Sequence, residues 1–246
     1  MIFGHYFNDF HILRTKLRRN KGINPTDNWV KNPKDLKGND FQDWFDTTSS
    51  EENSIEQAEK DFNNRIIEGI EDIKFKNSCE IGFGGGRLLY QASKFFNDAY
   101  GIDIHDNFQE TSNFLKRNKV ENFHLLNFDE RNNLPKIDLF YSFIVIQHFE
   151  KLEVLKSYIE LIHSKLSSGG YAVLWYGKLS TSLWGDYYEV PTSNFRKREC
   201  SLYIRPCFME ELCSNFQIIE SSPKHPKSVE TKKGQSMQAK IILRKI

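Results

Sequence analysis

The sequence lacks the features that mark several large protein classes. It has only four cysteines, with no C-x-x-C pair and no histidine at a zinc-ligand spacing beside them, which favours a reduced, intracellular chain. No apolar run approaches the roughly 20 residues of a membrane helix. The start of the chain has neither the basic nor the apolar region of a signal peptide. We therefore expect a cytoplasmic protein with no membrane contact.

An excess of charge is missing as well. The 34 Lys and Arg side chains are balanced by 33 Asp and Glu, a net charge of +1. This balance excludes polyanion binding over the whole surface, although Arg14–Lys21 forms a local basic run. Hydrophobic residues (39%) and charged residues (27%) are present in ordinary globular proportions, whereas aromatic residues are abundant at 14%.

The chain divides into parts of different composition. Residues 1–54 are polar and interrupted by glycine and proline, yet they contain eight large aromatic residues. We expect this N-terminal arm to fold as a lid onto a main domain over residues 55–246. That domain is predicted to begin with a helix over residues 55–73, because isoleucine and phenylalanine recur there at helical spacing. Asn53 or Ser54 is the expected cap.

From Asn77 onward, short apolar runs alternate with helical patterns, which is typical of βαβ units. The expected strands are Ser78–Gly82, Ala99–Ile104, Phe123–Leu126, Ile137–Val145, Tyr171–Trp175, Phe216–Glu220 and Gln238–Arg244. The expected helices are Arg87–Phe96, Asn107–Asn118 and Glu150–Leu166, the last ended by Gly169 and Gly170. A polar connection between the last two strands suits an antiparallel pair. The predicted fold is α/β, a doubly wound seven-stranded mixed sheet with the last strand antiparallel and helices on both faces.

The strongest chemical signal lies between the first expected strand and the helix after it. Glycines there let the backbone approach a ligand and expose N–H groups near a positive helix end. A dinucleotide fingerprint would need glycine or alanine where Arg87 stands, and a P-loop would need Gly-Lys-Ser/Thr. What remains is an acidic residue followed by alternating glycines: Glu80, Gly82, Gly84 and Gly86.

This pattern resembles motif I of the class I S-adenosylmethionine-dependent methyltransferases. Asp103 ends the second strand, where the family's acidic residue accepts hydrogen bonds from the ribose hydroxyls, although a helix cap is an alternative role. Asp129 follows the third strand, where the family places an acid near the adenine amino group. The resemblance covers residues 77–175 closely and 208–246 loosely. It implies a Rossmann-like fold and S-adenosylmethionine as the cofactor.

The resemblance implies further cofactor contacts. Ile104 is expected against the adenine face, and Ser142 near the methionine end. Asn127 or Glu130 could take the role of Asp129, and Ser142 could serve packing instead.

The proposed chemistry also needs an acceptor site. The sulfonium methyl is already activated, so the enzyme must align a nucleophile and exclude water, and a hydroxyl nucleophile needs a base as well. His148, at the exit of the fourth strand, is the candidate base, because histidine titrates near neutral pH. A pocket-shaping role for His148 is the alternative.

An insertion over residues 176–205 follows the fifth strand, at the edge where open α/β sheets bind ligands. We expect Tyr176, Trp184 and Tyr187 from this insertion to contact the acceptor. Aromatic residues with a few cations suit a sugar, a phenolic metabolite or an anionic small molecule. The alternative is that these aromatics form an auxiliary core.

The sequence therefore predicts an S-adenosylmethionine-dependent methyltransferase that acts at oxygen on a small molecule or a carbohydrate, without a metal. A nucleic-acid methyltransferase is the alternative favoured by the basic runs. The near-neutral charge and the missing Asn/Asp-Pro-Pro-Tyr signature weigh against nucleic acid. A non-catalytic partner subunit with the same fold is a further alternative. The acceptor, the methylated atom and the oligomeric state are not predicted.

Overall fold

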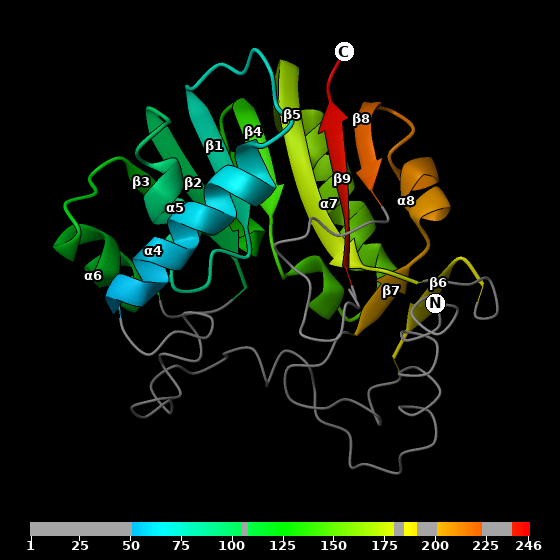
Figure 1. Ribbon diagram of the computed structural model, residues 1–246, viewed down its shortest axis with the longest axis horizontal. Coiled ribbons are helices and arrows are strands. Elements are labelled where there is room, and N and C mark those ends of the chain that lie inside the picture. The colour runs from blue at the N-terminus through cyan, green and yellow to red at the C-terminus, as the bar shows by residue number, and fades with distance from the viewer. Residues whose placement is uncertain (1–50, 105–107, 180–184, 191–200, 223–237) are drawn as a thin grey trace, which may run out of the picture. The chain divides into compact units, whose positions relative to one another are not determined.

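The computed structural model describes residues 51–104, 108–179, 185–190, 201–222 and 238–246 (Figure 1). The chain divides into two compact units. We call the first the glycine-loop unit; it comprises Val30–Tyr141 and Lys165–Ala172. We call the second the histidine unit; it comprises Met1–Trp29, Ser142–Ser164 and Val173–Ile246. The predicted arm lies outside the described residues except for its last four, which belong to a helix.

The strands form a seven-stranded sheet in the order β3-β2-β1-β4-β5-β9-β8. In the glycine-loop unit, β1 (Asn77–Ile81) pairs in parallel with β2 (Asp98–Asp103) and with β4 (Ile137–Ser142), and β2 pairs in parallel with β3 (Phe123–Asn127). Every residue of β4 is buried, as expected for a central parallel strand that is mostly apolar.

The histidine unit contributes the antiparallel edge of this sheet. There β8 (Gln217–Ser222) pairs antiparallel with β9 (Gln238–Arg244). Figure 1 shows β9 running opposite to both β8 and β5 (Leu166–Gly177), with α7 (Leu152–Lys165) behind β5 and β9. The predicted fold class, a mixed doubly wound sheet with its last strand antiparallel, is confirmed.

One predicted boundary in this region is wrong. Gly169 and Gly170 do not end α7, because β5 begins at Leu166 directly after the helix. Gly170 serves close packing instead: a Cβ there would lie 3.0 Å from the backbone oxygens of Asp138 and Ser167. The glycine pair is therefore a strand feature, and the expected strand begins five residues too late.

The first helix also differs from its prediction. It begins at Glu51 as α4 (Glu51–Asp61) and continues as a π-helix, η3 (Phe62–Ile67), so Asn53 and Ser54 lie inside the helix and not at its start. Two acidic residues in its first turn favour this earlier start. The helical segment ends before residue 73 because Gly69 and Asp72 have positive φ angles of 86° and 57°.

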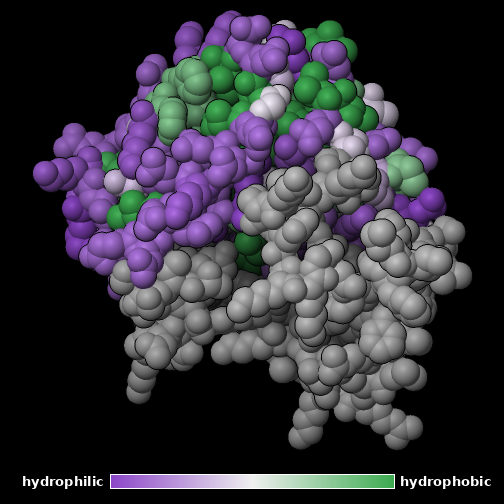
Figure 2. Space-filling model, viewed as in Figure 1, coloured by the Kyte–Doolittle hydropathy of each residue, from purple (hydrophilic) through white to green (hydrophobic). Residues whose placement is uncertain are grey.

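The other helices described in the glycine-loop unit are short. They are α5 (Arg87–Ala92), α6 (Phe108–Arg117) and a 3₁₀ helix, η4 (Phe128–Asn133). Figure 1 shows α4 in front of the strands of this unit, and Figure 2 shows hydrophilic surface over it. Within the described residues, no helix is long and apolar enough to cross a membrane.

Candidate functional site

The glycine loop joins β1 to α5 and has a left-handed backbone at three positions. The φ angles are 78° at Gly82, 49° at Gly84 and 85° at Gly86. A Cβ on Gly86 would lie 2.7 Å from Cγ2 of Thr111, so this glycine permits close packing against α6. A Cβ on Gly84 would meet no atom within 4 Å. Gly84 therefore lines open space that a ligand can approach.

Asp103 lies against this loop. One carboxylate oxygen accepts a hydrogen bond from the Gly84 N–H at 2.8 Å, and the other accepts from the Ile104 N–H at 2.7 Å. Asp103 thus binds the glycine loop, and α6 begins five residues later at Phe108. The structure brings together the two strongest parts of the predicted cofactor site.

Glu80, the acidic residue of the motif, is buried inside β1. Only 4% of its surface is exposed, and the Tyr141 hydroxyl donates a hydrogen bond to it at 3.4 Å. Burial raises the pKa of Glu80 well above its usual range, while the charge of Arg87 acts in the opposite direction. The motif therefore carries a carboxyl group whose ionisation depends on its charged neighbours.

Arg87 belongs to a buried ionic cluster that the sequence analysis missed. Its guanidinium lies 2.8 Å from Asp61, at the end of α4, and Arg65 binds the other oxygen of Asp61 at 2.9 Å. Gln57 donates a further hydrogen bond to the same carboxylate at 3.0 Å. The cluster ties the first residue of α5 to the helix before the sheet. Helical spacing alone could have suggested the i, i+4 partners of Asp61, but not Arg87.

The other predicted adenine contacts are more exposed. Ile104 is 50% exposed at the end of β2. The Asp129 side chain is 94% exposed, in a 3₁₀ helix where Asn127 and Glu130 form a capping box with each other. Their roles toward the cofactor stay predictions.

In the histidine unit, a strained turn follows β4. Ser142, the last residue of the strand, is fully buried. Two residues later, Ile144 has a φ angle of 62°, a left-handed backbone that β-branched residues rarely adopt. The turn leads into a single 3₁₀ turn, η5 (Ile146–His148). Such strain persists where the surrounding structure enforces it, and functional sites are common places for it.

His148 ends this turn and is half-buried. Its Nε2 lies 3.0 Å from the side-chain nitrogen of Gln147, whose side-chain oxygen accepts a hydrogen bond from Gln238 of β9. The Gln147 amide thus holds the His148 ring at Nε2, and the tautomer of the ring depends on which way this amide is turned. General-base catalysis by this ring would require it to be neutral.

The insertion after β5 contains a small sheet that the sequence analysis missed. Its strands β6 (Tyr187–Glu189) and β7 (Leu202–Ile204) pair antiparallel. A Cβ on Gly177 would collide with the carbonyl oxygen of Leu202, so this glycine lets β7 approach the end of β5. A carboxylate oxygen of Glu189 accepts from the Leu152 N–H at 2.8 Å and so caps α7.

The three predicted acceptor contacts have different surroundings. Tyr187 is 38% exposed and stacks on Phe208 of α8 (Pro206–Leu212), with 5.8 Å between ring centroids. Tyr176 is fully buried, where burial and the nearby Glu210 raise the pKa of its hydroxyl. Trp184 lies outside the described residues. Contact of these side chains with an acceptor stays a prediction.

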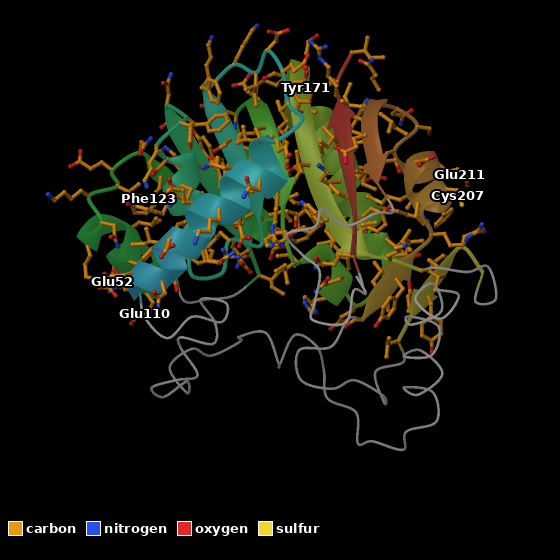
Figure 3. All side chains as sticks on the ribbon, in the orientation of Figure 1. Glu52, Glu110, Phe123, Tyr171, Cys207 and Glu211 are labelled. Carbon is orange, nitrogen blue, oxygen red and sulfur yellow. The ribbon has the colours of Figure 1, made fainter. Side chains whose placement is uncertain are left out.

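Metal-ligating side chains do not gather in the described part of the chain: it contains no group of three or more His, Cys, Asp and Glu side chains that could hold an ion. Cys207 and Glu211 are exposed on the outer side of α8, one turn apart (Figure 3).

Comparisons with known proteins agree with this geometry. Residues 79–174 match the family model of the methyltransferase domain. No curated protein sequence matches the chain significantly. Residues 79–174 are thus a methyltransferase domain, in agreement with the predicted family and enzyme class.

Three solved structures have the same fold. The N-methyltransferase NodS from Bradyrhizobium japonicum WM9, in complex with S-adenosyl-L-homocysteine, is 13% identical with a TM-score of 0.55, over 84% of this chain and 97% of its own. An S-adenosylmethionine-dependent methyltransferase from Mesorhizobium loti is 13% identical with a TM-score of 0.55, over 72% and 94%. Another from Clostridium acetobutylicum ATCC 824 is 14% identical with a TM-score of 0.53, over 97% and 98%.

Proposed function

We propose that this chain, a methyltransferase by its domain and its fold, transfers the methyl group of S-adenosylmethionine to a hydroxyl group of a small molecule or a carbohydrate. The cofactor follows from the family and from NodS, a protein of the same fold that binds S-adenosyl-L-homocysteine. The hydroxyl acceptor rests on one observation: His148, the candidate base, is half-buried, and its ring lies 3.0 Å from the Gln147 amide that holds it.

The residues of the glycine-loop unit fit the cofactor. The open space at Gly84 leaves room for a ligand against the loop backbone. Asp103 presents a carboxylate at the edge of that loop, and carboxylates accept hydrogen bonds from both hydroxyls of a ribose. When bound, the cofactor supplies an activated sulfonium methyl group. The protein has to hold it in line with the acceptor and keep water away.

His148 would take the proton of the acceptor hydroxyl. General-base catalysis requires a neutral group whose pKa lies near the working pH, and histidine is the side chain that meets this condition most readily. The Gln147 amide, which is 8% exposed, fixes the ring and shields it on one side. An amine or carboxylate acceptor would not need such a base, so His148 favours an oxygen nucleophile in a hydroxyl group.

Aromatic surface in the same unit supports a ring-shaped acceptor. The parallel rings of Tyr187 and Phe208, with 15° between their planes, leave Tyr187 partly exposed. Sugars and phenols both pack against such flat aromatic surfaces. The ion pair between Asp186 and Arg205 at 2.7 Å holds the strand that carries Tyr187.

The test is a search for the methylated product. The full chain is incubated with metabolite extracts and S-adenosylmethionine carrying a deuterated methyl group, and mass spectrometry identifies labelled products. We expect a labelled methyl ether of a small molecule or carbohydrate. His148→Gln should lower kcat by about 10²- to 10⁴-fold and leave cofactor affinity unchanged. Glu153→Gln, at an exposed position near the start of α7, is the control.

Two outcomes would contradict the proposal. A label found only on nitrogen would remove the hydroxyl acceptor, and full activity of His148→Gln would remove the base. Labelling of RNA instead of metabolites would favour the nucleic-acid alternative.

A further inference from the structure

Three consecutive glycines form the centre of the loop between β1 and α5. Gly84, Gly85 and Gly86 have no side chains to hold them in place, and glycine has more backbone freedom than any other residue. Two of them nevertheless have left-handed backbones, with φ angles of 49° at Gly84 and 85° at Gly86. Side chains outside the loop therefore have to contribute to its order.

Thr111 of α6 contacts two of these glycines at once. Its hydroxyl donates a hydrogen bond to the carbonyl oxygen of Gly84 at 2.8 Å. Its methyl carbon, Cγ2, lies only 2.7 Å from the position that a Cβ on Gly86 would occupy, so the methyl group packs directly on the Gly86 backbone. Thr111 is fully buried. One side chain thus holds the loop through a polar atom and through an apolar atom.

The Gly84 backbone is held on both sides of its Cα atom. Asp103 accepts a hydrogen bond from the Gly84 N–H, and Thr111 donates one to the Gly84 carbonyl oxygen. The first bond orients the peptide group before Gly84 and the second orients the peptide group after it, so together they restrict both φ and ψ. All three residues belong to the glycine-loop unit. The two bonds therefore fix how Gly84 borders the open space beside the loop.

We propose that Thr111 is a positioning residue for the cofactor and acts through the loop backbone: its hydroxyl orients the Gly84 peptide, and its methyl group supports Gly86. A loop that is already ordered in the free protein binds more tightly, because ordering it during binding would cost conformational entropy. The hydroxyl therefore contributes to cofactor affinity, and the methyl group contributes to stability. This inference rests on the cofactor site proposed at the glycine loop, and it is independent of the acceptor and of His148.

Substitutions at position 111 separate the two contacts. Thr111→Ser keeps the hydroxyl and loses the methyl group, Thr111→Ala loses both, and Thr111→Val has a methyl group in place of the hydroxyl. Titration calorimetry of the full chain with S-adenosylhomocysteine measures cofactor affinity. Chemical denaturation without ligand measures stability and shows whether each variant is folded.

We expect affinity to follow the hydroxyl. Thr111→Val and Thr111→Ala should raise Kd by about 5- to 30-fold, as expected when the backbone of one residue has to be ordered during binding. Thr111→Ser should stay within about threefold of the wild-type Kd although it is less stable, because its lost methyl group leaves the Gly86 backbone less well packed. A purely structural role for Thr111 predicts the opposite, an affinity that falls together with stability.

Phe114→Leu is the matched control on the same helix. Phe114 is fully buried about one turn after Thr111, and its ring packs against Tyr90 of α5 with 6.0 Å between centroids. The substitution weakens the packing of α6 and keeps the Thr111 hydroxyl. We expect it to lower stability and to leave the affinity for S-adenosylhomocysteine unchanged.

Three results would overturn the inference: wild-type affinity in a folded variant without the hydroxyl, or a loss of affinity as large as in Thr111→Ala in either Thr111→Ser or Phe114→Leu. If Thr111→Val does not fold, Thr111→Ser and Thr111→Ala still decide, because they differ only in the hydroxyl. Failure of the underlying cofactor site is a separate result. Unchanged affinity in Gly84→Ala would mean that the loop is not the site, whereas weaker binding in Gly84→Ala with full affinity in Thr111→Ala would overturn the role of Thr111 alone.

Discussion

The two units differ in the chemistry of the candidate residues that each contains. Near the glycine loop, the buried carboxylate of Asp61 pairs with Arg65 and Arg87, and Glu80 is buried as well. Beside His148, the neutral amide of Gln147 contacts the ring, and Gln238 hydrogen-bonds to Gln147. The difference matches the proposed ligands, because S-adenosylmethionine carries several charges and a sugar or phenol hydroxyl carries none. Charged residues suit the binding of a charged cofactor. An amide, which can donate or accept a hydrogen bond, suits a histidine that takes up a proton.

The largest expected effect tests the buried ionic cluster. Asp61→Leu leaves two buried guanidinium groups without their carboxylate, and removing one partner of a buried pair typically costs about 3–5 kcal/mol of unfolding free energy. Asp186→Leu is the matched control in the other unit, since its pair with Arg205 is partly exposed and pairs of that kind contribute about 0–1 kcal/mol. Chemical denaturation measures both. Equal losses in the two variants would show that the cluster is no more important than a surface pair.

The next effect separates the folding role of the loop from its binding role. Gly86→Ala should cost about 2–4 kcal/mol, because a left-handed backbone is combined with overlap on Thr111. Gly84→Ala has the backbone cost alone, about 1–2 kcal/mol, but its methyl group enters the open space beside the loop. We therefore expect Gly84→Ala to remain folded and to lose affinity for S-adenosylhomocysteine in titration calorimetry. A folded Gly84→Ala with wild-type affinity would exclude the loop as the cofactor site.

Asp103 gives a somewhat smaller effect on binding. Asp103→Ala removes the proposed acceptor for the ribose hydroxyls, and hydrogen bonds that involve a charged group contribute about 1.5–3 kcal/mol, roughly 10- to 150-fold in Kd. Asp103→Asn keeps an oxygen that can accept from the Gly84 N–H, so it separates loss of charge from loss of loop order. Calorimetry with both variants decides. Unchanged affinity in Asp103→Ala would mean that the aspartate serves only the loop.

The fold could be predicted from the sequence wherever the hydrophobic pattern of a single helix or strand reflects its burial. The strand β4 is buried throughout and mostly apolar, and it lies where the sequence predicted it, except that it ends three residues before the predicted end. The small sheet of β6 and β7 was missed because its three-residue strands are too short for any periodicity. The junction of α7 with β5 was misread because two glycines after a helix usually indicate a cap.

The candidate site residues also divide into those that local spacing predicts and those that it does not. The glycine loop and Asp103 could be found because their spacing follows from strand ends and loop length. Arg87 and Gln238 act through partners 26 and 91 residues away, and no local pattern encodes such a pairing. The positive φ of Ile144 could not be predicted either, since isoleucine normally indicates the opposite backbone.

The pH dependence of stability tests whether ionisation of Glu80 destabilises the glycine-loop unit. Its folded-state pKa is raised by burial, so the contribution of this residue to stability is fully present at low pH and is lost as pH rises above the ordinary value for a carboxyl group. Glu80→Gln removes the titration but keeps the shape. We expect the variant to gain stability relative to the wild-type chain at pH 8 and to lose this advantage toward pH 4. A difference that does not change with pH would show that the Glu80 carboxyl is not destabilised by ionisation.

The smallest effect concerns the turn that precedes His148. Ile144 and Val145 are both half-buried, but Ile144 has a φ angle of 62° and Val145 one of −113°. From side-chain size alone, Ile144→Gly should cost more stability than Val145→Gly, since isoleucine has one more methylene group to lose. A left-handed backbone, however, disfavours isoleucine by about 1–2 kcal/mol, and glycine relieves this cost. We therefore expect Ile144→Gly to destabilise the chain less than Val145→Gly, by about 1 kcal/mol in denaturant unfolding. The reverse order would mean that the turn stores no strain, and the conformation of His148 would then have to be fixed by its amides alone.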